Sequence, residues 1–140
     1  MQRWFGATAK HRGFQLLYLD KNSWLQEGDG LSFWTRGESR AELLVRTNEP
    51  ERRLQLRLEA GPTPVNVDLE LEGRRATMAL AAGQWGVVQF ASEPGFRFKN
   101  IQNQVSYIWR LSITTHGGFT PVNSPDTRFL GVKVLPLIIR

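Results

Sequence analysis

The chain contains no cysteine among its 140 residues, which excludes a disulfide framework, a cysteine-ligated zinc site and a thiol nucleophile. It has two histidines, His11 and His116, and neither a Gly-x-Ser-x-Gly elbow nor a Gly-x-x-x-x-Gly-Lys-[Ser/Thr] phosphate loop. A catalytic triad needs a histidine base beside a nucleophile and a third group that orients the base. Since no segment offers such a set, we predict that the protein is not an enzyme.

Long apolar runs and long basic runs are also missing. No stretch approaches the roughly 18 apolar residues that a membrane-spanning helix needs, and we expect no such segment in this chain. The formal net charge is +5 and the pI about 10.2. The bases are nevertheless scattered among acids, as in Glu72-Gly73-Arg74-Arg75, and no lysine/arginine block exceeds two residues. A mixed solvated surface explains this distribution, so we expect no nucleic-acid partner.

The sequence is rich in apolar residues that alternate with polar ones. In the segment Val65–Glu72 every second residue is valine or leucine, and the residues between them are asparagine, aspartate or glutamate. A period of two is typical of half-buried strands, because successive side chains point to opposite faces of a sheet. Comparable patterns, separated by turn residues, predict strands over Phe14–Leu19, Leu31–Thr35, Ala41–Arg46, Arg53–Glu59, Val65–Glu72, Ala76–Leu80, Gly86–Phe90, Gln104–Thr115 and Phe129–Leu135.

Eight or nine short strands at this spacing indicate a sandwich or a barrel. We predict an all-β fold: a two-sheet antiparallel β-sandwich, jelly-roll-like, with about eight strands. A length of 140 residues fits one domain. Residues 1–12 are expected to form an N-terminal arm, and residues 13–140 the sandwich domain.

Aromatic residues provide the strongest indication of a binding site. The chain has five tryptophans, eight phenylalanines and two tyrosines, and flat rings can stack on the apolar faces of sugars. Trp109 and Tyr107 lie on the long predicted strand and are expected in the core. Planar polar groups that donate and accept hydrogen bonds suit sugar hydroxyls. The residues predicted to bind a ligand combine these two properties: Trp24, Trp34, Trp85, Arg97 and Asn103.

A structural calcium ion is a second possibility, although we expect no cofactor. Calcium prefers six to eight oxygen ligands, many of them from loops. Oxygen-bearing side chains cluster near residue 25, and another lies in a later loop, but their spacing does not match an EF-hand. Ordinary turn-forming roles account for the same residues: Asp20, Asn22, Glu27, Asp29 and Asp126.

Two stretches carry a resemblance to a known type of domain. One is Glu27–Leu43, with the sequence EGDGLSFWTRGESRAEL, and the other combines Gly118–Pro121 with Asp126–Val134. Together they resemble a C-terminal β-sandwich domain of bacterial envelope proteins, including membrane glycosyltransferases. The resemblance implies an accessory module like the carbohydrate-binding sandwiches, in an extracytoplasmic or cell-envelope location. It also implies that Phe33 and Trp34 are core or rim aromatics, and that Asp126 with Arg128 fixes the last loop to the sandwich.

These observations favour a non-catalytic module that binds carbohydrate through loop or groove aromatics. The alternative is a structural or assembly domain that contacts proteins through its edge strands. The apolar run Leu135–Ile139 motivates this alternative, since an exposed strand edge can pair with another chain. A homo-oligomer is one form that such pairing can take.

Overall fold

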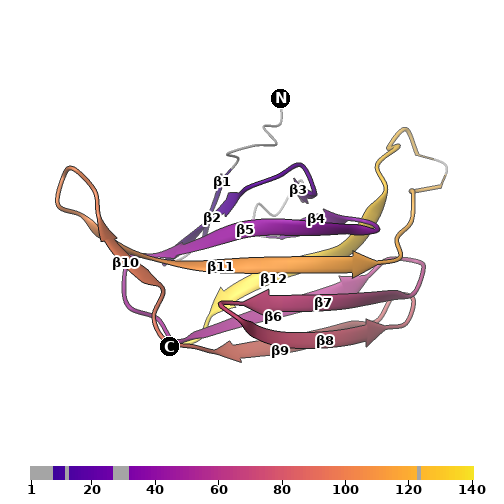
Figure 1. Ribbon diagram of the computed structural model, residues 1–140. Helices are drawn as coiled ribbons and strands as arrows, with labels where there is room; N and C mark the ends of the chain where they lie inside the picture. The colour runs from indigo at the N-terminus through magenta and orange to yellow at the C-terminus, as the bar shows by residue number, and fades with distance from the viewer. Residues whose placement is uncertain (1–7, 12, 27–31, 123) are drawn as a thin grey trace.

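The computed structural model describes residues 8–11, 13–26, 32–122 and 124–140, and these residues form two antiparallel sheets without a helix. Figure 1 shows the sheets as two layers, with the long strands β5 and β11 in one and β12 in the other. The strands are β1 (Thr8–His11), β2 (Phe14–Tyr18), β3 (Ser23–Leu25), β4 (Phe33–Arg36), β5 (Ser39–Thr47), β6 (Arg53–Ala60), β7 (Val65–Leu71), β8 (Arg74–Leu80), β9 (Trp85–Ala91), β10 (Phe96–Lys99), β11 (Val105–His116) and β12 (Leu130–Ile138).

The first sheet has seven strands in the order β1-β2-β5-β11-β7-β8, and β10 pairs with one end of β11. The second sheet has five strands in the order β3-β4-β12-β6-β9. After β5 the chain passes repeatedly from one sheet to the other, as in a jelly roll. The predicted fold class, a two-sheet antiparallel sandwich of the jelly-roll kind, is therefore confirmed.

The core lies between the sheets and is filled by the apolar half of each alternating strand. In β7 all four apolar side chains are buried, while the acidic and amide side chains face outward. Trp109 is 2% exposed, and Phe33 on the opposite sheet is fully buried. The ring of Tyr18 meets that of Phe33 edge-on across the interior, with centroids 5.2 Å apart. Burial of this apolar surface is the main stabilising contribution to the sandwich.

The two sheets are also joined by a buried pair of hydroxyls. Thr35 Oγ1 lies 2.9 Å from Thr115 Oγ1 in the opposite sheet. The same Thr35 oxygen accepts a hydrogen bond from the backbone N–H of Val132 at 3.1 Å. The pairing of β12 with β4 shifts register at this point, so the threonine hydroxyl satisfies a backbone donor that the irregular ladder leaves without a carbonyl partner.

The described residues contain more strands than the nine segments predicted from the alternation. Those nine segments all correspond to strands, with ends that coincide or differ by at most three residues; Leu31, the predicted start of one of them, lies outside the described residues. The three additional strands, β1, β3 and β10, have three or four residues each, too few for a period of two to stand out. β1 lies within the segment expected as an N-terminal arm and pairs with β2.

The apolar run near the C-terminus belongs to β12, inside the five-stranded sheet. Residues 132–138 pair with β6, and Val134 and Ile138 are buried in the core. Within the described residues, β8 ends the seven-stranded sheet and β9 ends the five-stranded sheet, so each of these strands has one edge without a neighbouring strand. No helix in the described part of the chain is long and apolar enough to span a membrane.

Candidate functional site

The outer face of the five-stranded sheet carries a row of aromatic and charged side chains. The register aligns Trp24 with Trp34, Trp34 with Lys133, Lys133 with Glu59, and Glu59 with Trp85. These residues share the outer face because their neighbours along each strand point into the core. With adjacent strands about 4.8 Å apart, Trp34 and Trp85 stand on strands about 14 Å apart. All three tryptophans predicted as ligand-binding residues therefore lie on one face.

Trp85, at the free edge of this sheet, is the most exposed described tryptophan. Its side chain is 55% exposed, and the guanidinium carbon of Arg57 lies 4.4 Å from the centre of its ring. This distance is within the range of a cation–π interaction. Arg57 therefore fixes the orientation of a ring that the solvent still reaches. Val87, the next outward residue of β9, is 42% exposed and extends the apolar edge.

A shallow hollow of about 230 Å³ lies on the same face over β6 and β12, next to the strand that carries Trp85, although Trp85 itself does not line it. Arg57 and Lys133 place two cations on it, Glu59 one carboxylate, and Leu135 an apolar floor; Ser32 completes the lining. Lys133 and Glu59 are direct neighbours in the register, yet no ion pair within 4.0 Å joins them or engages Arg57 among the described residues. A ligand could therefore meet these charged groups without displacing an ion pair between described residues.

The other two tryptophans of the row are more enclosed. Trp34 is half-buried, donates its indole N–H to the Gln26 side-chain oxygen at 2.7 Å, and meets the Phe119 ring edge-on with centroids 5.6 Å apart. Trp24 is only 8% exposed, and the Arg128 guanidinium carbon lies 5.5 Å from its ring centre. Trp24 thus contributes packing at the end of the row, and the accessible aromatic surface is that of Trp85.

A two-residue ion pair holds the loop that covers Trp24. Arg128 donates to both carboxylate oxygens of Asp126, with the shortest distance, 2.7 Å, from Nη2 to Oδ2. The hydrogen bonds from the Arg128 side chain and backbone lower the pKa of Asp126 to about 2. The pair is ionised at neutral pH and keeps Arg128 beside the ring, which agrees with the role that the resemblance implies for these two residues.

Arg97 and Asn103, the two polar residues predicted to bind a ligand, lie elsewhere. Both belong to the β10–β11 hairpin, which extends the seven-stranded sheet, and both are exposed. Asn103 sits in the tight turn with a φ of 61°, a left-handed conformation that asparagine tolerates better than most residues. The structure therefore does not bring these two side chains together with the tryptophans.

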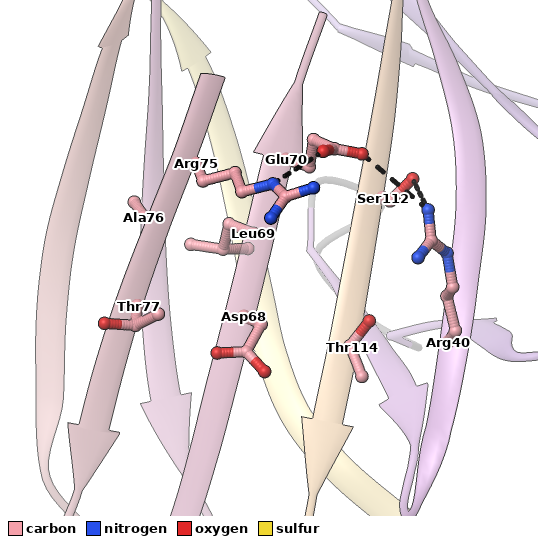
Figure 2. Close-up of a pocket in the computed structure, with 9 residues that line it drawn as sticks. All are labelled: Arg40, Asp68, Leu69, Glu70, Arg75, Ala76, Thr77, Ser112 and Thr114. Carbon is pink, nitrogen blue, oxygen red and sulfur yellow. Dashed lines mark hydrogen bonds and ion pairs between the residues drawn. The ribbon is translucent and has the colours of Figure 1, made fainter. Parts of the chain in front are cut away.

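The outer face of the seven-stranded sheet offers a second, polar hollow of about 360 Å³. Figure 2 shows it between strands β8, β7, β11 and β5, lined on one side by Arg75 and Thr77 and on the other by Arg40 and Thr114. No aromatic residue lines it. Glu70, at its upper end in Figure 2, lies 3.0 Å from Arg75 and 3.8 Å from Arg40, so the charges around this hollow are already engaged with one another.

Glu42 is the centre of that network. Arg40 Nε donates to one of its oxygens at 2.7 Å, Ser112 Oγ donates to the other at 2.7 Å, and Arg110 lies 3.7 Å away. Partial burial raises the pKa of Glu42, but the hydrogen bonds and the nearby cations outweigh it, so the net pKa lies below its usual value. His116 Nε2 and Asp68 form a further pair at 2.9 Å. The charged residues around this hollow are therefore paired with one another.

The predicted calcium ligands do not form a cluster in the described part of the chain. The Asp20 carboxylate accepts hydrogen bonds from the backbone N–H groups of Asn22 and Glu42, both at 2.9 Å. Asp126 is paired with Arg128. Glu27 and Asp29 lie outside the described residues, and no group of three potential metal-ligating side chains occurs within them.

Sequence reasoning missed Arg57, Glu59 and Lys133. Each occupies an outward position of an alternating strand, where a charged residue is the ordinary expectation for a solvated face. The sequence alternation showed only that these three side chains point outward from their strands. What the sequence does not contain is the register, which places residues 57, 59, 85 and 133 beside one another.

No family model matches this chain, and no curated protein matches it. Solved structures with some likeness include a family two carbohydrate esterase from Cellvibrio japonicus, at 13% identity and a TM-score of 0.43, of which this chain spans 35%. The alignment covers 96% of this chain.

Two others are structures of carbohydrate-binding modules. TmCBM61, in complex with β-1,4-galactotriose, is 5% identical with a TM-score of 0.37, and the alignment covers 94% of this chain and 92% of that one. Xyl-CBM35, in complex with a glucuronic acid-containing disaccharide, is 14% identical with a TM-score of 0.39, covering 89% and 97%. At these similarities the alignments assign no ligand to this chain, and the envelope-protein resemblance stays a prediction.

Proposed function

We propose that this domain is a non-catalytic carbohydrate-binding module whose site is the outer face of the five-stranded sheet. The observation that carries the proposal is the exposed Trp85 ring, oriented by Arg57, which also lines a hollow whose charged groups form no ion pair with a described residue. Trp85 would stack on one face of a sugar ring. Arg57, Lys133 and Glu59 would hydrogen-bond the hydroxyls around the rim of that sugar.

The arrangement of the site suits sugars because they present both apolar and polar surface. A pyranose has apolar C–H faces, which favour a flat aromatic partner, and a rim of hydroxyls that donate and accept hydrogen bonds. The Trp85 ring offers the first kind of surface, and Arg57, Lys133 and Glu59 offer donors and acceptors next to it. Leu135 and Val87 add apolar area on which further sugar units can rest.

The charges of the hollow favour saccharides that carry carboxylates. Arg57 and Lys133 provide two cations against the single carboxylate of Glu59. A guanidinium matches a carboxylate geometrically and can bind it through two parallel hydrogen bonds. The proposed ligand class is therefore an oligosaccharide that contains uronic acid units, with neutral oligosaccharides binding more weakly.

Titration calorimetry with a matched pair of neutral and uronate-containing oligosaccharides tests the proposal. We expect saturable binding of the acidic member, and a loss of at least about tenfold in affinity for Trp85→Ala, because an aromatic anchor at a binding site contributes about 2 kcal/mol. Trp85→Phe should retain most of the affinity. Since Trp85 is 55% exposed, its removal should leave the thermal stability nearly unchanged.

Phe96→Ala is the matched control, because Phe96 is also an exposed aromatic but lies on the other sheet. Equal losses for Trp85→Ala and Phe96→Ala would overturn the assignment of the site. If neither oligosaccharide binds, the proposed function is wrong. If the protein then showed a mass that rises with concentration, pairing through the free edge of β9, which carries no charged residue, would become the better interpretation.

A further inference from the structure

The β10–β11 hairpin presents apolar side chains to the solvent at one end of the sandwich. Figure 1 shows its loop reaching beyond the body of the molecule, on the side where β11 begins. Ile101 stands in this loop and is completely exposed, at 101% of its reference area, and Phe96 at the base of the hairpin is 77% exposed. Nothing in the proposed sugar site uses either residue.

The backbone around Ile101 is held by internal hydrogen bonds. The Asn100 side-chain oxygen accepts from the N–H groups of Gln102 and Gln104, at 2.9 and 3.0 Å. The N–H of Asn103 donates to the Asn100 carbonyl, and the N–H of Asn100 donates to the Gln104 carbonyl, both at 3.0 Å. Four of the five N–H groups in residues 100–104 therefore have partners within the turn.

The hairpin is also purely cationic. Residues 96–104 contain Arg97 and Lys99 and no acid, and neither cation takes part in an ion pair with a described residue. Arg46, which also forms no ion pair with a described residue, adds a third cation nearby. It is aligned with Ile108 on β11, and Ile108 is in turn aligned with Phe96. The apolar tip thus stands on a positively charged base.

From these features we infer that the hairpin docks this end of the domain on an anionic lipid bilayer. Ile101 enters the apolar boundary, Phe96 rests at the interface, and Arg97 with Lys99 contacts the anionic headgroups. The site is distinct from the outer face of the five-stranded sheet, so a domain docked in this way leaves the Trp85 face accessible.

The turn's hydrogen bonds favour a bilayer over a polar partner. A loop that enters the apolar boundary must satisfy its backbone groups internally, because lipid tails offer no hydrogen-bond partners. In residues 100–104 four of the five N–H groups meet this condition, two of them through the Asn100 side chain, and the N–H of Ile101 is the exception. Basic residues next to an apolar insertion are attracted by the negative surface potential of anionic lipids. The combination is suited to a shallow, reversible attachment.

Co-sedimentation of the whole chain with lipid vesicles tests this inference. We expect binding to vesicles of phosphatidylcholine with phosphatidylserine, little binding to phosphatidylcholine alone, and weaker binding as salt is added. Ile101→Asp should lower the affinity for the mixed vesicles about tenfold or more, because an apolar insertion is replaced by a charge. Arg97→Ala and Lys99→Ala should each lower it about fivefold.

Val122→Asp is the matched control, since Val122 is 82% exposed and lies in the loop between β11 and β12. It should leave vesicle binding unchanged, as should Trp85→Ala. The inference fails if the unaltered protein does not sediment with the mixed vesicles, or if Ile101→Asp and Val122→Asp reduce binding equally. If vesicles are not bound but Ile101→Asp converts a self-associating protein into a monomer, the hairpin is a protein contact instead.

Discussion

The outer faces of the two sheets both carry charged residues but differ in how those charges are paired. On the seven-stranded sheet Glu42 and Glu70 engage Arg40, Arg75 and Arg110, so these three cations are paired with acids of the same face. On the five-stranded sheet Arg57 and Lys133 have no ion-pair partner among the described residues, and Arg57 instead covers an exposed tryptophan.

This difference shows why hollow size alone does not identify a binding site. The hollow on the seven-stranded sheet is the larger, at about 360 Å³ against 230 Å³. A ligand there would have to displace ion pairs that already satisfy the charged groups. On the five-stranded sheet a ligand would meet charged groups that form no ion pair with a described residue, so binding there displaces no such pair and adds the apolar contact of the ring.

Introducing an acid beside Arg57 should make the five-stranded face resemble the other. Leu135 is half-buried and aligned with Arg57 in the register, so Leu135→Glu places a carboxylate where it can pair with Arg57. We expect the affinity for a uronate-containing oligosaccharide, measured by titration calorimetry, to fall at least about tenfold. The new carboxylate would pair with Arg57 and repel the carboxylate of the ligand.

The control for this exchange is Leu135→Gln, which has nearly the same shape without the charge. It removes the same apolar contact from the hollow, so the difference between the two variants isolates the charge. Equal losses for Leu135→Glu and Leu135→Gln would mean that the apolar floor, and not the free cations, determines the affinity.

The sequence was sufficient to predict the fold because the long strands carry enough alternation. β7 exposes an acid or an amide at each outward position, and every inward one is an apolar residue that reaches the core. β3 was missed for a physical reason: in a strand of three residues, Ser23 faces the core while Trp24, on the opposite face, is buried under Arg128. Its burial pattern therefore has no period of two.

The site could be predicted only in part, because side-chain exposure depends on contacts between distant segments. Trp24 and Trp85 were equivalent candidates in the sequence, each near a predicted turn. In the structure Arg128 covers the first, whereas the second stands at a free sheet edge. Arg57 and Lys133 could not be selected in advance because their significance comes from the register, which alternation alone leaves undetermined.

Removing the central acid of the seven-stranded face should reduce stability and leave sugar binding unchanged. In Glu42→Gln the charge that holds Arg40 and Ser112 is lost, and we expect urea unfolding at pH 7 to show a loss of about 1 kcal/mol, limited by partial exposure to solvent. The Trp85 face should bind the acidic oligosaccharide as before, because the sandwich core separates the two faces. A loss of sugar affinity in this variant would place Glu42 in the binding surface.

The same variant has a defined dependence on pH. The pKa of Glu42 in the folded protein lies below its ordinary value, so its stabilising contribution is complete above the unfolded pKa of about 4.3. It is lost as the pH falls through the lowered folded pKa. The stability difference between the unaltered protein and Glu42→Gln should therefore shrink as the pH falls below about 4.3 and through the lowered folded pKa. A constant difference over this interval would indicate that the variant acts through packing.

The smallest effect on stability and on sugar binding is expected when a cation is freed on the seven-stranded face, where no exposed tryptophan among the described residues lies beside it. Glu70→Gln frees Arg75 from its 3.0 Å contact, whereas Arg40 keeps its 2.7 Å pair with Glu42, so the seven-stranded face gains one available cation. Because Arg75 is 82% exposed, the stability should change by less than about 0.5 kcal/mol. We also expect no measurable new site for the acidic oligosaccharide by titration calorimetry, since hydrated cations on an open surface bind an anion only weakly at physiological salt. A second binding event in Glu70→Gln, of affinity similar to that at the Trp85 face, would mean that free cations are sufficient and that the aromatic ring is dispensable.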